Sequence, residues 1–256
     1  MGIIYSIKSN DSLQLIKAIQ TAKDFAEKKI DKNTVGIAFL GAIARGYYDA
    51  LADIDIAFFQ NNSSGSKHQT EYHKVDGFEI HCHVSDYESE AEEAWEMSKR
   101  WAFSHNQIYY DPQFKILRLL QKKLPLRPDE RKWLLISGIT LSEWYINRLT
   151  HLWIERGSVV SAHYMFTEGL NHFFSMLFAF NNELVADHKW RYYCAERLER
   201  LPPSFTEELN EVMFLHSMDT DEIKRRQKAF MEMWKYMLPL VEQEVKMSFD
   251  DFKNLV

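Results

Sequence analysis

Two aspartates, Asp53 and Asp55, lie two positions apart at the start of an apolar segment. Because successive strand residues point to opposite faces, a strand here would project both carboxylates from one face and bury Ile54 and Ile56 on the other. Two carboxylates on one face repel each other unless a cation lies between them. Oxygen ligands of this kind suit Mg²⁺, which binds a few carboxylates together with phosphate oxygens and water. The spacing therefore predicts a magnesium site.

A third acid follows in an alternating segment. Glu79, His81 and His83 alternate with apolar residues over 78–84, so all three would share one strand face. If this strand lies beside the first, Glu79 becomes a third carboxylate. Three acids can bind two Mg²⁺ ions, or bind one and supply a general base, and either arrangement suits nucleotidyl transfer from a nucleoside triphosphate. The two histidines also allow a zinc site with Glu79, although such a pair without a further His or Cys ligand is more typical of a partly exposed strand face.

A connection that contains two glycines precedes the aspartates. Gly41 and Gly46 allow backbone amides to approach a phosphate closely, and Arg45 adds a positive charge in the same turn. Arg45 can alternatively pair with Asp49 on a solvated turn. The connection predicts a phosphate-binding turn beside the acidic site.

The elements that must position these residues alternate between helical and strand patterns. Asn10 or Asp11 is available to cap the first helix. The expected elements are a helix over 12–30, strands over 35–40, 54–59 and 78–84, a polar loop over 61–66, a helix over 88–100 and a short strand over 107–110.

From residue 114 onward the patterns are almost entirely helical. The expected helices lie over 114–123, 130–155, 158–181, 189–198 and 222–246. We therefore place a domain boundary at Asp111–Pro112. The sequence predicts an α+β fold class, with a mixed sheet and flanking helices over 1–111 and a helical bundle over 112–256.

Composition limits the class of protein. The chain has 256 residues, 27% of them charged and 46% hydrophobic, and a net charge of −6. These fractions exclude a disordered or fibrous chain, and the acidic balance disfavours a broad nucleic-acid surface. Two cysteines, Cys82 and Cys194, are too few for a disulfide framework and indicate a reducing, cytoplasmic setting. We expect no targeting segment and no membrane span.

The motif residues resemble a known superfamily. Gly41-Ala42, then Asp53-x-Asp55 about ten residues later, and a later acid on another strand are similar to the nucleotidyltransferase signature. Ala-Arg-Gly over 44–46 makes the likeness closer to the bacterial nucleotidyltransferases that modify kanamycin, streptomycin/spectinomycin and lincosamides. In that group a helical domain follows the catalytic one. The resemblance implies Mg²⁺-dependent transfer of a nucleoside monophosphate, AMP from ATP, to a hydroxyl of a small molecule such as an aminoglycoside-like antibiotic.

The resemblance also implies roles for individual residues. Asp53 and Asp55 would bind the metal, with Glu79 as third ligand or base. The triphosphate would be held by Gly41, Ala42 and Arg45. The acidic balance of the chain suits a cationic acceptor.

A weaker resemblance concerns the second domain. Residues 180–183 (Phe-Asn-Asn-Glu) and 188–190 (His-Lys-Trp) resemble a Phe-x-x-Asn segment followed by Lys-Trp in the helical domains of such enzymes, which makes Lys189 a candidate to close over the triphosphate. One residue departs from the pattern, since Ala42 stands where the superfamily has serine. Loss of one hydroxyl contact costs about 0.5–1.5 kcal/mol, so it predicts weakened rather than abolished activity.

Four other interpretations remain open. Ala42 favours a non-catalytic, antitoxin-like regulatory protein on the same fold. Arg156 and His163 have the spacing of the ribonuclease motif in HEPN toxin domains, although Gly157 between them is expected to end a helix. A binding module could use the cleft without catalysis. Glu143 and Glu168, on apolar helices, could recognise a cationic substrate or serve as the base.

Overall fold

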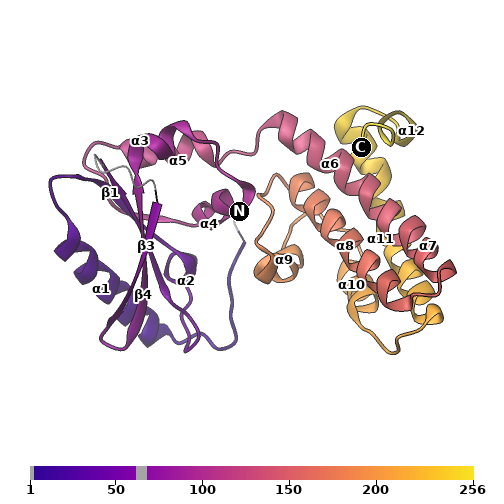
Figure 1. Ribbon diagram of the computed structural model, residues 1–256, viewed down its shortest axis with the longest axis horizontal. Coiled ribbons are helices and arrows are strands. Elements are labelled where there is room, and N and C mark those ends of the chain that lie inside the picture. Colours follow the sequence, from indigo (N-terminus) through magenta and orange to yellow (C-terminus); the bar gives the residue numbers. More distant parts are fainter. Residues whose placement is uncertain (1–2, 62–67) are drawn as a thin grey trace. The chain divides into compact units, whose positions relative to one another are not determined.

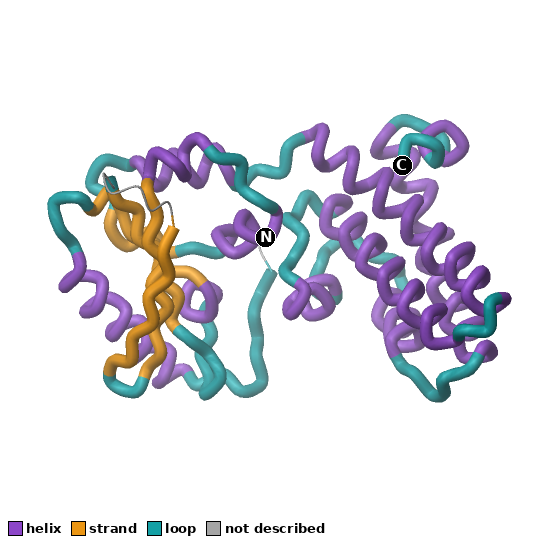
Figure 2. Tube along the Cα trace, viewed as in Figure 1, coloured by secondary structure: helices purple, strands orange, loops and turns teal. Residues whose placement is uncertain are grey.

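The computed structural model describes residues 3–61 and 68–256, so the predicted loop over 61–66 lies, from residue 62 on, outside the described residues. The chain divides into two compact units, Met1–Pro125 and Leu126–Val256. Strands and helices mix in the first unit, and the second is helical (Figures 1 and 2). The predicted α+β class, a mixed sheet with flanking helices followed by a helical region, is confirmed.

The described part of the first unit contains one five-stranded mixed sheet in the order β3-β4-β2-β1-β5. The central pair β2 and β4 is parallel, and all other neighbours are antiparallel. The strands are β1 (Thr34–Leu40), β2 (Ile54–Gln60), β3 (His68–Val75), β4 (Phe78–Asp86) and β5 (Gln107–Tyr110). Strand β3 was not expected, because it is an edge strand whose side chains are mostly exposed and polar.

Short helices flank this sheet. Helix α1 begins after Asp11, whose side chain accepts hydrogen bonds from the backbone N–H groups of Leu13 and Gln14. The segment expected as one helix over 88–100 forms two, and part of the expected connection before Asp53 forms the short helix α2. The helices are α1 (Ser12–Lys29), α2 (Gly41–Arg45), α3 (Tyr87–Glu92), α4 (Met97–Ser104) and α5 (Lys115–Lys123).

The division between the units lies later in the chain than the expected boundary at Asp111–Pro112. Helix α5 packs on β1, and its Ile116, Leu119 and Leu120 are buried in the core of the first unit. These apolar side chains need the sheet to cover them, so the segment after Pro112 belongs to the first unit.

The second unit has α8 at its centre. Phe166, Phe173 and Phe178 of this helix are fully buried, and the Phe173 ring lies 5.2 Å from that of Phe230 in α11. The helix expected over 130–155 is continuous but includes a π-helical segment, η1. The elements are α6 (Pro128–Glu143), η1 (Trp144–Leu149), α7 (Thr150–Glu155), α8 (Val159–Phe180), α9 (His188–Ala195), α10 (Phe205–Met213), α11 (Thr220–Val245) and α12 (Phe249–Phe252). None of the helices in the described ranges has the length and apolarity that a bilayer crossing requires.

Candidate active site

The parallel pairing of β2 with β4 creates the site. In this register Ile54 lies opposite Ile80, and Asp55 lies opposite His81. Both isoleucines are fully buried, so the polar residues that alternate with them share the other face of the sheet. The two strands lie side by side, which is the condition that the sequence left open.

Three side chains converge at the start of the two strands. Asp53, Asp55 and His81 each offer a ligand atom, and these atoms lie within 4.8 Å of one another. The Nδ1 atom of His81 is 3.1 Å from Oδ2 of Asp53 and 3.8 Å from Oδ1 of Asp55. Two carboxylate oxygens and one imidazole nitrogen at this spacing fit a divalent cation.

Glu79 lies beside this group rather than in it. Its Oε1 atom is 3.0 Å from Nε2 of His81, on the far side of the ring from the aspartates, and its side chain is 67% exposed. The sequence predicts Glu79 as the third ligand, and the register that places His81 opposite Asp55 also places Glu79 next to Asp53. Glu79 lies outside the group because its carboxylate contacts the outer nitrogen of His81 instead. His81 had been considered only for a zinc site with Glu79, although its alternation with Glu79 was visible in the sequence.

Further contacts fix the Asp55 carboxylate. Nε2 of His83 lies 3.2 Å from Oδ1 of Asp55, and Nδ1 of the same ring lies 3.2 Å from the Thr70 hydroxyl. Gly41 has a φ of +61°, and a Cβ atom there would overlap Oδ2 of Asp55. Glycine is required at this position both for the backbone conformation and for the close approach of Asp55.

Gly46 has a different role from Gly41. It ends α2 in the left-handed conformation, with a φ of +81°, and no atom lies within 4 Å of where its Cβ would be. This is the usual use of glycine after a short helix, so Gly46 shapes the turn. Ala42, the second residue of α2, is buried.

The guanidinium of Arg45 is engaged inside the first unit. It lies 4.4 Å from the ring centre of Trp101 and 5.5 Å from that of Tyr5. It also donates hydrogen bonds to the backbone carbonyls of Gly41 and Trp101, each at 3.3 Å. The alternative partner, Asp49, instead accepts from the Ser9 hydroxyl and the Leu51 backbone N–H. Arg45 thus holds the turn in place, and contact with a phosphate would require it to leave these partners.

The residues singled out in the helical region belong to the second unit. Lys189 is an exposed residue in the first turn of α9, and its backbone N–H donates to Asp187. His163 is buried, and its Nδ1 lies 2.9 Å from a guanidinium nitrogen of Arg226. Gly157 separates Arg156 from the helix that carries His163, as expected. Because His163 is also buried, the two residues do not form an exposed ribonuclease site.

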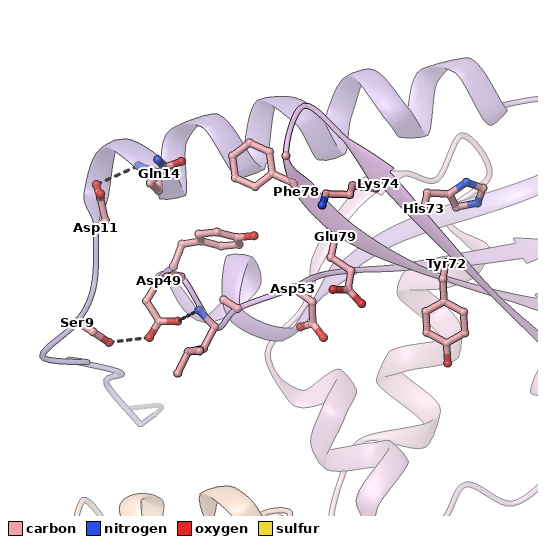
Figure 3. Close-up of a pocket in the computed structure, with 15 residues that line it drawn as sticks. Ser9, Asp11, Gln14, Asp49, Asp53, Tyr72, His73, Lys74, Phe78 and Glu79 are labelled. Carbon is pink, nitrogen blue, oxygen red and sulfur yellow. Dashed lines mark hydrogen bonds between the residues drawn. The ribbon is translucent and has the colours of Figure 1, made fainter.

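A cavity of about 830 Å³ opens beside Asp53. Figure 3 shows Asp53 and Glu79 at this cavity, with Asp49 and Lys74 also at its wall. Hydrogen bonds from the Ser9 hydroxyl and the Leu51 backbone lower the pKa of Asp49, which keeps that carboxylate ionised.

Tyr48 is another residue of the cavity wall, and burial is the main influence on its pKa. Burial, followed by the negative charges of Asp53 and Asp49, raises its pKa to about 12. The phenol therefore stays neutral near pH 7. The wall bears four carboxylates and one lysine: Asp11, Asp49, Asp53, Glu79 and Lys74.

Comparison with known proteins identifies the fold. No protein-family model and no curated protein matches the sequence. Among solved structures, the chain is similar to a nucleotidyltransferase-like protein from Exiguobacterium sibiricum 255-15, with a TM-score of 0.51 and 10% sequence identity. The match covers 89% of this chain and 77% of that protein. The chain therefore has a nucleotidyltransferase-like fold.

Proposed function

We propose that this protein is a metal-dependent nucleotidyltransferase. It moves a nucleoside monophosphate, AMP from ATP, onto a hydroxyl of a small cationic molecule and releases pyrophosphate. The observation that carries the proposal is the convergence of Asp53, Asp55 and His81 on the two central strands of the sheet, in a chain with a nucleotidyltransferase-like fold. An aminoglycoside-like antibiotic is the acceptor that the sequence resemblance favours.

Asp53 and Asp55 hold the cation in this proposal. When bound, a divalent ion neutralises charge on the phosphate oxygens and favours in-line displacement at the α-phosphorus. Gly41 lies directly against Asp55, so the backbone of the turn at Gly41 and Ala42 is beside any phosphate held there. Lys189, in the first turn of α9, is proposed as a further triphosphate-binding residue, as the resemblance of residues 188–190 implies.

The cavity beside Asp53 is proposed to receive the acceptor. Its wall has more carboxylates than cations, which favours a positively charged ligand. The Glu79 side chain lines the same cavity, so we propose that its carboxylate accepts the proton of the attacking hydroxyl. In that step the acceptor oxygen bonds to the α-phosphorus, the bond to pyrophosphate breaks, and the proton passes to the Glu79 carboxylate.

The test is a transfer assay with a matched set of variants. The protein is incubated with each nucleoside triphosphate, a divalent metal and a panel of aminoglycosides and uncharged polyols. Pyrophosphate release and the mass of the acceptor are measured. We expect an acceptor that gains one nucleoside monophosphate, and a loss of at least about 100-fold in rate for Asp53→Asn. Asp250→Asn, an exposed aspartate of the second unit, is the control and should retain full activity.

A second candidate is a regulatory module that binds a nucleotide without turnover. Two observations favour it: Ala42 lacks the hydroxyl of the superfamily serine, and His81 lies where the sequence predicted a carboxylate. Metal-dependent ATP binding, measured by calorimetry, without pyrophosphate release from any acceptor would support this candidate. Absence of metal-dependent ATP binding would overturn both.

A further inference from the structure

We propose that His81 binds the metal through Nδ1 and makes this centre select a transition-metal ion of the Co²⁺ and Zn²⁺ type over Mg²⁺. The proposal deepens the proposed function, since the role of the metal in nucleotidyl transfer is taken from there. Its ligand set rests on the geometry of three side chains.

The two nitrogens of the His81 ring have different surroundings. Nδ1 faces the two aspartates, at 3.1 Å from Asp53 and 3.8 Å from Asp55, while Nε2 lies 3.0 Å from Glu79. A histidine that binds a metal commonly donates its other ring N–H to a carboxylate, which fixes the ring and strengthens the ligating nitrogen. With Nε2–H donating to Glu79, the lone pair of Nδ1 is directed to the place where the ion would lie.

Packing holds the ring in this orientation. The Tyr72 ring meets the His81 ring edge-on, with 4.9 Å between centres and 78° between planes. The second ligand is fixed as well, since His83 contacts one oxygen of Asp55 and the Gly41 turn lies against the other. The donor atoms are therefore arranged before any ion binds, which favours affinity and selectivity.

The donor set decides which ion is preferred. Mg²⁺ takes oxygen ligands almost exclusively and retains several waters, whereas imidazole nitrogen suits Co²⁺, Zn²⁺ and their neighbours. Three carboxylates, as expected from the sequence, would have suited Mg²⁺. In the structure the third donor beside the two aspartates is His81, and the Glu79 carboxylate contacts the outer nitrogen of that ring. Glu79 is thereby a positioning residue for His81, in addition to its place on the cavity wall.

The test is metal binding by the full chain without nucleotide. Co²⁺ is titrated while its visible absorption is recorded, and Co²⁺ and Mg²⁺ affinities are measured by calorimetry. We expect one Co²⁺ per chain, bound at least about tenfold more tightly than Mg²⁺. Equal or tighter binding of Mg²⁺ would overturn the proposal.

Variants of His81 distinguish a direct role in metal binding from a general effect on folding. His81→Asn should weaken Co²⁺ binding at least about tenfold, and His81→Asp should reduce the preference for Co²⁺ over Mg²⁺. His151→Asn removes an exposed histidine of the second unit and should change neither affinity. Circular dichroism confirms that each variant is folded. Unchanged Co²⁺ affinity in folded His81→Asn contradicts the proposal.

Glu79→Gln tests the positioning role. We expect its Co²⁺ affinity to fall about tenfold, with a shifted absorption spectrum and an unchanged melting temperature. The two proposals fail separately. Co²⁺ binding through His81 without any nucleotidyl transfer overturns the proposed function only, and Mg²⁺-supported transfer with a metal affinity indifferent to His81 overturns this inference only.

Discussion

Two polar clusters, one in each unit, use charged side chains in opposite ways. The acid–histidine cluster of the first unit consists of Asp53, Asp55, Glu79 and His81. The arginine cluster of the second consists of His163, Glu222, Arg225 and Arg226. In the second, the buried Glu222 accepts hydrogen bonds from Arg225 at 2.7 and 3.0 Å, so charge is neutralised within the protein. The first gathers three carboxylates around one imidazole ring, which leaves negative charge for a ligand.

We propose that the first cluster is a site for a cation, whereas the second stabilises the fold. Carboxylates that share a face repel each other until a cation binds, so their removal should harm ligand binding more than stability. Removal of a buried carboxylate that pairs with arginine should instead reduce stability more than ligand binding, because loss of either partner leaves the other without its hydrogen bonds. Paired substitutions in the two clusters test the distinction.

The largest expected effect is on metal binding by the acid–histidine cluster. Asp53→Asn together with Asp55→Asn should weaken Co²⁺ binding by more than about 100-fold, because both negatively charged carboxylates are replaced by neutral amides. The free energy of unfolding, measured with urea, should stay the same or rise as the repulsion between the carboxylates is removed. Metal affinity that survives the double substitution would show that the cluster is not the binding site.

A pair of glycine substitutions gives the next effect in size. Gly41→Ala places a methyl group against Asp55 and should reduce Co²⁺ affinity about 10–100-fold. Gly46→Ala also introduces a side chain at positive φ, but nothing lies near its Cβ. Both variants should lose about 1 kcal/mol of unfolding free energy, and only the first should lose metal affinity. Equal metal affinities in the two variants would contradict the close contact between Gly41 and Asp55.

Much of the site was predictable because strand periodicity is local. The spacing of Asp53 and Asp55 placed both carboxylates on one face, and the apolar residues between them placed the other face in the core. The choice between Glu79 and His81 was not predictable. It depends on the register between two strands that are distant in sequence and on the direction that each side chain takes from their shared face. The residues of one strand alone specify neither.

Long-range packing explains the other differences. Arg45 was expected at a phosphate, yet Trp101, which comes from α4, stacks on its guanidinium. The expected boundary at Asp111–Pro112 and the division after Pro125 differ because the change to helical patterns precedes the end of the first core. Strand β3 and helix α10 were missed, the former because an exposed edge strand lacks a clear apolar alternation.

The arginine cluster predicts a stability effect that depends on pH. The Arg225 guanidinium lowers the pKa of Glu222 from its ordinary 4.5 to about 2. A lowered pKa in the folded state gives stability that is present above about pH 4.5 and is lost as the pH falls toward 2. Glu222→Gln should cost about 1–3 kcal/mol at pH 7, measured by urea denaturation, and metal affinity should not change.

The same denaturation series, repeated from pH 6 down to about pH 2.5, tests the cause. The stability difference between the wild-type protein and Glu222→Gln should shrink over this range. A difference that stays constant with pH would mean that the charge of Glu222 is not what stabilises the second unit.

The smallest effect concerns nucleotide binding beside the acid–histidine cluster. Ala42→Ser restores the hydroxyl that the superfamily has, and should strengthen metal-dependent ATP binding by about 0.5–1.5 kcal/mol. Ala44→Ser, in the same short helix, is the matched control and should leave ATP affinity unchanged. Calorimetry with a non-hydrolysable ATP analogue measures both. Equal ATP affinities for the two serine variants would place the triphosphate away from this turn.

The most direct test of the central claim is a crystal structure with Co²⁺ and a non-hydrolysable ATP analogue, recorded at the cobalt absorption edge. We expect an anomalous peak about 2.0–2.2 Å from oxygens of Asp53 and Asp55 and from Nδ1 of His81, with triphosphate oxygens on the same ion. A peak elsewhere, or a triphosphate bound away from the Gly41 turn, would contradict it.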